Sequence, residues 1–145
     1  MKYFLLIMSF VTLILSGCAE PMRNYEMVLK SQPAKVKDVS FLEGNWNCDV
    51  PARNGTVNAH YIVRGNQVNV TTTDSNGSSM EFLYSAEISG DVLTLTGGSK
   101  TNAAYSNIVK KYKVVNDHAM QTISNYISGM DMTQAGGIAY CIKNN

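Results

Sequence analysis

The feature that most constrains this chain is a regular alternation of apolar and polar residues. Between Val57 and Val63 apolar side chains stand at every second position, and the pattern returns in later segments. A period of two places successive side chains on opposite faces, as in a half-buried β-strand. Turn signals such as Asp74–Gly77 separate the segments. Strands are predicted over residues 46–50, 57–63, 67–73, 80–88, 92–96, 105–115, 120–127 and 137–142.

The spacing of these segments favours a closed β-structure. Several short strands with turn signals between them indicate a sandwich or a barrel. Because every connection is short, the simplest topology is an antiparallel up-and-down meander, and closing it into a barrel removes both sheet edges. We therefore predict an all-β chain with a small eight-stranded antiparallel barrel over residues 40–145.

The N-terminus has the pattern of an export signal. Lys2 precedes an apolar run, Tyr3–Leu15, that contains no charged residue. The run is shorter than the roughly 20 apolar residues that span a bilayer, and a basic start before a short apolar segment is typical of a secretory signal. The next residues, Leu15–Cys18, resemble the lipobox of bacterial lipoproteins. This resemblance implies cleavage before Cys18, acylation of that cysteine and a stable membrane anchor.

The lipobox also predicts how the chain is divided. Residues 1–17 form a signal peptide that is removed, and residues 18–39 form the lipidated N-terminus and a polar tether. A brief helix over residues 23–30 is compatible with that tether. Ala19 follows the cysteine, and by the Gram-negative sorting rule the absence of Asp at this position favours the outer membrane. The domain is then expected to face the periplasm, with a cell-surface location left open.

The charge of the mature chain disfavours nucleic acid as a partner. The full sequence has 12 basic and 11 acidic residues, and removal of Lys2 with the signal leaves 11 of each. A net charge of zero provides no basic excess for phosphate groups. The predicted partners are instead the membrane, through the lipid anchor, and a small apolar ligand or an envelope protein.

Export also constrains the two remaining cysteines, Cys48 and Cys141. An even pair in an oxidising compartment is best interpreted as a disulfide. The first and last strands of an up-and-down barrel are neighbours, so this bond is predicted to join the closing seam. Cys141 alternates with the apolar Tyr140 and Ile142, so a bulge or an apolar outer patch is needed there. Two buried free thiols are the alternative, and no CxxC motif or His cluster supports metal binding by the pair.

The segment Phe41–Trp46 gives a resemblance to a known family. Its residues Gly44-Asn45-Trp46 resemble the Gly-x-Trp signature at the first strand of lipocalin-like domains. The resemblance covers residues 40–145 and implies a short helical turn before the strand, with Trp46 plugging the closed end of the barrel. The domain is smaller than a typical lipocalin and lacks the C-terminal helix of that family, and the resemblance implies no particular ligand.

A second resemblance concerns Asn47-Cys48-Asp49 and the alternating strand that follows. This arrangement is similar to that of the membrane-bound inhibitors of c-type lysozyme, which insert a Ser-Gly-x-x-Tyr-type loop into the lysozyme cleft. The nearest stretch here, Gly97–Tyr105, departs from that motif. The resemblance implies a lysozyme-like partner. Two glycine-rich and weakly charged loops, residues 97–104 and 129–136, are candidates for contact with another protein.

Few side chains point to catalysis or metal binding. His60 and His118 are the only imidazoles, and neither lies in a catalytic motif, so we predict no enzymatic activity, cofactor or metal. One group, His118 with Met120, Met130 and Met132, offers imidazole and thioether donors that suit Cu(I). The alternative is that Met120 packs in the core and that Met130 and Met132 belong to a flexible loop.

Two hypotheses of function remain, and neither is an enzyme. In the first, the anchored barrel binds a small apolar ligand or an envelope component in an interior cavity. In the second, a filled barrel acts on another protein through its loops. The interior of an eight-stranded barrel holds side chains or one small ligand, so a cavity distinguishes the two. The bulky residues that favour a filled interior are Tyr61, Phe82, Tyr84, Tyr112, Tyr126 and Tyr140.

Overall fold

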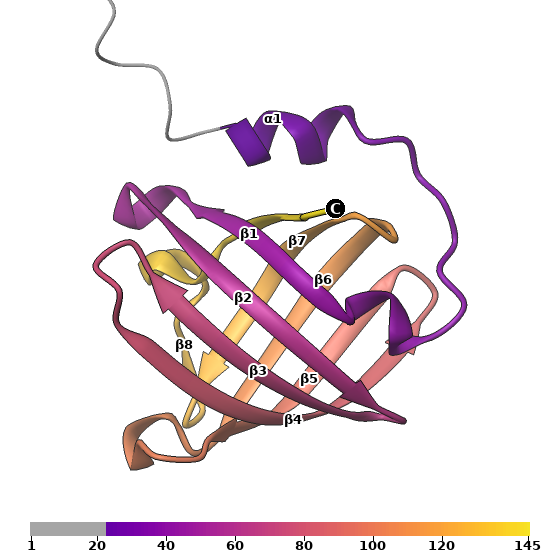
Figure 1. Ribbon diagram of the computed structural model, residues 1–145. Helices are drawn as coiled ribbons and strands as arrows, with labels where there is room; N and C mark the ends of the chain where they lie inside the picture. The colour runs from indigo at the N-terminus through magenta and orange to yellow at the C-terminus, as the bar shows by residue number, and fades with distance from the viewer. Residues whose placement is uncertain (1–22) are drawn as a thin grey trace, which may run out of the picture.

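The computed structural model describes residues 23–145, whose strands close into a β-barrel (Figure 1). The barrel strands are β1 (Gly44–Val50), β2 (Gly55–Arg64), β3 (Gln67–Asp74), β4 (Ser79–Ser89), β5 (Val92–Ser99), β6 (Ile108–Asn116), β7 (Ala119–Ile127) and β9 (Tyr140–Lys143). Each strand pairs antiparallel with the next, and β9 closes the ring between β7 and β1. The predicted all-β, eight-stranded up-and-down barrel is confirmed.

The predicted period of two is visible in the burial of the strands. In β4, Phe82, Tyr84 and Ala86 are buried, whereas the residues between them are exposed. The pairing of β6 with β7 contains two register shifts, one between Val114 and Asn116 and one where Lys111 pairs with Ser124 while Tyr112 pairs with Thr122. The extra residue between these pairs is a β-bulge, which changes the direction of the β7 side chains at this point.

The closing seam joins β1 and β9. Cys48 and Cys141 face each other in the register and form a disulfide with an S–S distance of 2.08 Å, which confirms the predicted bond. The neighbouring Tyr140 is only partly buried, and the ring of Tyr25 packs edge-on against it, with the ring centroids 4.6 Å apart. An apolar outer patch at the seam, one of the two predicted solutions, is therefore present and is covered by the N-terminal helix.

One end of the barrel is filled by an aromatic cluster. A short 3-10 turn, η1 (Val39–Leu42), precedes β1 and places Phe41 and Leu42 over Trp46, which is fully buried. The indole Nε1 of Trp46 donates to the carbonyl of Leu42 at 2.8 Å, and the ring packs edge-on against Phe41. The Lys143 ammonium lies 5.9 Å from the centre of the indole. Trp46 thus closes the end of the barrel nearest η1.

The N-terminal helix α1 (Arg23–Lys30) lies across β1 and beside β9 (Figure 1). Its first residues are held by the buried Asp49 carboxylate, which accepts from the backbone N–H of Asn24 at 2.7 Å and of Tyr25 at 3.3 Å. On the same face of α1, Val28 is buried. This part of the segment predicted as a tether is therefore a helix docked on the barrel.

The irregular segment between α1 and η1 is also attached to the barrel. The backbone N–H of Ala34 donates to Val115 at 2.8 Å, and the Asn116 side chain donates to the carbonyl of Gln32 at 2.9 Å. Lys2, Cys18 and the predicted signal peptide lie outside the described residues. Within residues 23–145, no helix has the length and apolar character needed to cross a membrane.

Candidate ligand cavity

The barrel encloses a cavity of about 190 Å³ at the end opposite η1. Its wall combines the inward residues of the strands with residues of three short connecting turns: η2 (Pro51–Arg53), η3 (Ala103–Tyr105) and the π-helical η4 (Thr133–Gly137). The Cys48–Cys141 disulfide forms part of this wall. The interior is therefore neither completely filled nor wide, and it has room for one small molecule.

The inner wall of the cavity carries three tyrosines, Tyr61, Tyr84 and Tyr112, all buried. Burial raises the pKa of Tyr61 well above its ordinary value, and the neighbouring Tyr112 and Tyr84 raise it further. Burial, and then Tyr112, also raise the pKa of Tyr84. These two phenols consequently stay neutral, so the inner wall is amphipathic without being acidic. By contrast, Tyr126 is exposed on the outer surface and does not fill the interior as expected.

Two cationic side chains also line the cavity. Lys110 projects inward from β6, where it occupies the same face as the buried Ile108 and Tyr112. Arg53 belongs to η2 and is exposed at the edge of the cavity. No Asp or Glu is among the cavity-lining residues of the described chain, and neither cation forms an ion pair within residues 23–145. The site therefore has a positive potential that the surrounding side chains leave uncompensated.

Asn125 is the polar group of greatest interest in this wall. It lies in β7 directly opposite Lys110 in the register, and only 6% of its surface is exposed. Its backbone is fully engaged, because its N–H donates to Thr133 Oγ1 and its carbonyl accepts from Met132. Its side-chain Oδ1, however, is buried without a hydrogen-bond partner in the described structure. A buried acceptor of this kind costs about 1–3 kcal/mol when it is left unpaired.

The turn η4 is packed closely on Asn125. A Cβ atom added to Gly137 would lie 2.9 Å from the Asn125 Cβ, so only glycine allows this approach. Two hydrogen bonds hold the turn at the rim: the N–H of Met132 donates to the carbonyl of Asn125, and the N–H of Asn125 donates to Thr133 Oγ1. The turn thereby fixes the position of the Asn125 amide in the cavity wall.

Sequence reasoning did not identify Lys110, Arg53 or Asn125. A signal for Lys110 was present, because Ile108, Tyr112 and Val114 share one face of the strand, and alternation places residue 110 on that face as well. Asn125 had no such signal, since its orientation depends on the bulge between β6 and β7. Arg53 lies in a turn, where no periodicity applies.

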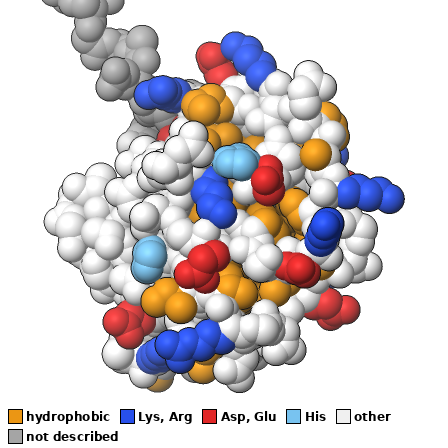
Figure 2. Space-filling model, turned by 45° about the vertical axis from the view of Figure 1, so that its right-hand side comes forward, with side chains coloured by type: hydrophobic (Ala, Val, Ile, Leu, Met, Phe, Trp, Pro, Cys, Tyr) orange, Lys and Arg blue, Asp and Glu red, His pale blue; other side chains and the backbone are white. Residues whose placement is uncertain are grey.

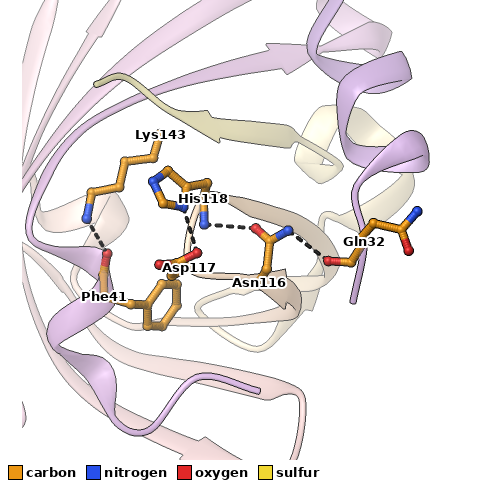
Figure 3. A network of polar contacts seen from close by, with 6 residues as sticks. All are labelled: Gln32, Phe41, Asn116, Asp117, His118 and Lys143. Carbon is orange, nitrogen blue, oxygen red and sulfur yellow. Dashed lines mark hydrogen bonds and ion pairs between the residues drawn. The ribbon is translucent and has the colours of Figure 1, made fainter. Parts of the chain in front are cut away.

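The group proposed as a copper site is not assembled. His118 and Met130 flank opposite ends of β7, which spans nine residues, or roughly 30 Å at about 3.3 Å per residue. Met120 is fully buried in the core, and Met130 is exposed. Figure 3 shows His118 beside Asp117, with Nδ1 2.6 Å from a carboxylate oxygen, in a polar network that includes Asn116 and Lys143. His118, Met120 and Met130 are therefore not brought together as a Cu(I) site would require.

The other imidazole, His60, is exposed on β2, and its Nδ1 lies 2.8 Å from Asn45 Oδ1. No group of three or more His, Cys, Asp or Glu side chains is arranged to hold a metal ion within the described part of the chain. On the face drawn in Figure 2, acidic and basic side chains are interspersed. That face therefore has no patch of side chains with one sign of charge, whereas the charged side chains described in the cavity wall are all cationic.

Comparisons with known proteins add no relative: no family model, no curated protein and no solved structure matches this chain.

Proposed function

We propose that this chain is a lipid-anchored envelope protein that binds one small, partly apolar ligand inside its barrel and catalyses no reaction. The observation that carries the proposal is the interior cavity of about 190 Å³. An engineered apolar cavity of about 150 Å³ accepts benzene, so the space suits a ring or a short chain. Tyrosine hydroxyls, Lys110 and Asn125 supply the few polar groups that orient a ligand in such a site.

The anchor is proposed from the lipobox, with acylation at Cys18. Arg23, the first residue of α1, is five positions later. Five residues reach at most about 18 Å, so an acylated Cys18 would keep the seam of the barrel close to the membrane. The protein would then be an envelope lipoprotein held against its membrane, most simply on the periplasmic face of the outer membrane.

The binding role is tested on residues 19–145 that have been exported to the periplasm and purified gently. Native mass spectrometry should detect an added mass that disappears on denaturation. Val57→Phe should abolish it, because residue 57 is half-buried in the cavity wall. The matched control is Thr96→Phe, which adds the same ring on the exposed face of β5. Equal retention of the ligand by both variants would overturn the cavity as the binding site.

The anchor is tested in the same expression system with the full chain. The wild-type protein should partition into detergent and incorporate labelled palmitate, and Cys18→Ser should do neither. A Cys18→Ser protein that remains acylated would contradict the lipobox assignment.

A protein-interaction role, such as inhibition of a lysozyme-like enzyme, is the second candidate. One observation favours it: the chain segments that follow the first predicted contact loop and precede the second are joined, because the N–H of Ser128 donates to the carbonyl of Asn107 at 2.6 Å. Under this hypothesis, substitutions on the loops would reduce partner binding, whereas Val57→Phe would leave it unchanged.

A further inference from the structure

The size of the cavity limits the ligand. About 190 Å³ is little more than the space that holds one benzene ring. The tyrosine-lined part of the wall therefore accommodates a ring or a chain of about six to eight non-hydrogen atoms, with the polar head of the ligand next to Lys110 and Asn125. A long acyl chain does not fit this volume.

The charged side chains of the cavity wall determine which charge the polar head of the ligand should carry. Lys110 lies on the inward face of β6 without an ion pair, Arg53 stands at the edge, and no carboxylate faces either of them among the described lining residues. An ammonium in a partly desolvated site gains most from an anion that accepts its hydrogen bonds. Because Tyr61 and Tyr84 stay protonated, they do not repel such an anion.

Asn125 adds a requirement of its own. Its unpartnered Oδ1 is an acceptor, so a ligand satisfies it only by donating an O–H or N–H. Directly opposed residues of antiparallel strands have Cβ atoms about 5 Å apart, so one small ligand can reach both side chains through neighbouring groups. The wall thus offers two binding groups. The Lys110 ammonium binds an anionic group of the ligand, and the neutral Asn125 Oδ1 accepts from a hydrogen-bond donor of the ligand.

We propose that the cavity binds a small organic acid that carries a hydroxyl or amide N–H next to its carboxylate. The carboxylate accepts from Lys110, the neighbouring donor satisfies Asn125 Oδ1, and the ring or short chain lies against the tyrosines. This assignment rests on the proposed binding function and names the chemistry of its ligand.

Three probes of nearly equal size test the assignment by isothermal titration calorimetry on residues 19–145. Mandelate has both the charge and the hydroxyl, phenylacetate lacks the hydroxyl, and mandelamide lacks the charge. Mandelate should bind more tightly than either. Lys110→Met should weaken mandelate by about tenfold to a hundredfold and leave mandelamide unchanged, since a hydrogen bond to a charged group contributes about 1.5–3 kcal/mol. Lys111→Met, which removes an exposed cation from the next position, should have no effect.

Asn125→Leu isolates the second contact. It should weaken the binding of mandelate by about fivefold and leave the binding of phenylacetate unchanged, because only mandelate has the hydroxyl donor. Thermal unfolding of each variant verifies that the barrel is intact. Mandelamide binding as tight as mandelate, or equal losses from Lys110→Met and Lys111→Met, would overturn the proposal.

Three further outcomes show which part of the proposal has failed. Phenyl phosphate binding more tightly than mandelate would replace the carboxylate with a phosphate ester and refute the assignment as stated. If no acidic probe binds while native mass spectrometry still shows a ligand that Val57→Phe removes, the acid is refuted and the binding function stands. If that ligand is retained by Val57→Phe, the cavity is not its binding site, and the proposed function inside the barrel fails together with the acid.

Discussion

At the scale of single residues, the interior tyrosines make the stability of the barrel sensitive to alkaline pH. Burial raises the pKa of both Tyr61 and Tyr84 above the value of about 10 that an unfolded chain has. The folded barrel therefore binds more protons than the unfolded chain above about pH 10. Its free energy of unfolding should be constant below that pH and should fall as the pH rises further, by about 2–3 kcal/mol per pH unit for two tyrosines.

Urea denaturation between about pH 8 and pH 11.5 measures this dependence. Tyr84→Phe removes one titrating group and should roughly halve the slope above about pH 10. Tyr126→Phe is the matched control, because Tyr126 is exposed. An equally steep alkaline loss in wild type and Tyr84→Phe would show that other groups cause it.

Lys110 shows how far the sequence could predict the site at this scale. Alternation along β6 was sufficient to place residue 110 inside, but a charged residue within an apolar face is more often assigned to the surface. The unpaired state of Asn125 Oδ1 could not have been predicted, because it depends on which atoms the bulge and η4 bring near it. The burial of Trp46, by contrast, was implied by the resemblance of Gly44-Asn45-Trp46 to the Gly-x-Trp signature of lipocalin-like domains.

At the scale of elements, α1 depends on a contact that is distant in sequence. Only eight residues long, it is too short for a helical period to stand out, and isolated helices of this length are marginal in water. Its N-terminal N–H groups are capped by Asp49 of β1. Because this cap comes from β1, the local sequence alone indicated a tether. The helix is stabilised by its contact with the barrel.

Substitution of Asp49 by alanine should release α1 from the barrel. Loss of a capping acceptor costs about 0.5–2 kcal/mol, which is enough to open a helix this short. Amide hydrogen exchange should become faster over residues 24–30 and stay unchanged in β4 and β5. Glu81→Ala removes an exposed carboxylate from β4 and should change neither region. Undiminished protection of α1 in Asp49→Ala would mean that Val28 and Tyr25 hold the helix without the cap.

At the scale of the whole molecule, the topology was the most predictable property. Short connections permit only neighbouring antiparallel strands, so eight alternating segments already define the order of the ring. What the ring encloses was not predictable, because a cavity depends on the sum of many side-chain volumes. Four bulky inward residues, Tyr61, Phe82, Tyr84 and Tyr112, leave about 190 Å³ between them and the cavity end.

The stability of the whole barrel should depend strongly on the Cys48–Cys141 disulfide. The bond closes a loop of 93 residues, and in the chain-entropy model a loop of this length contributes about 4–5 kcal/mol by restricting the unfolded chain. The β9 strand has only four residues, so its ladder with β1 adds few hydrogen bonds to the seam. The double variant Cys48→Ser/Cys141→Ser should therefore lose about 20 °C in melting temperature by scanning calorimetry.

Reduction of the wild type separates the stabilising effect of the disulfide bond from that of the packing of the two cysteine side chains. A reductant should lower the melting temperature of the wild type to near that of the double variant and leave the variant unchanged. A wild type that melts within a few degrees of its reduced form would show that β1 and β9 hold the ring closed without the bond. Since both cysteines also line the cavity, the same samples link the seam to the site. An opened seam should weaken mandelate binding even at temperatures where the reduced barrel remains folded.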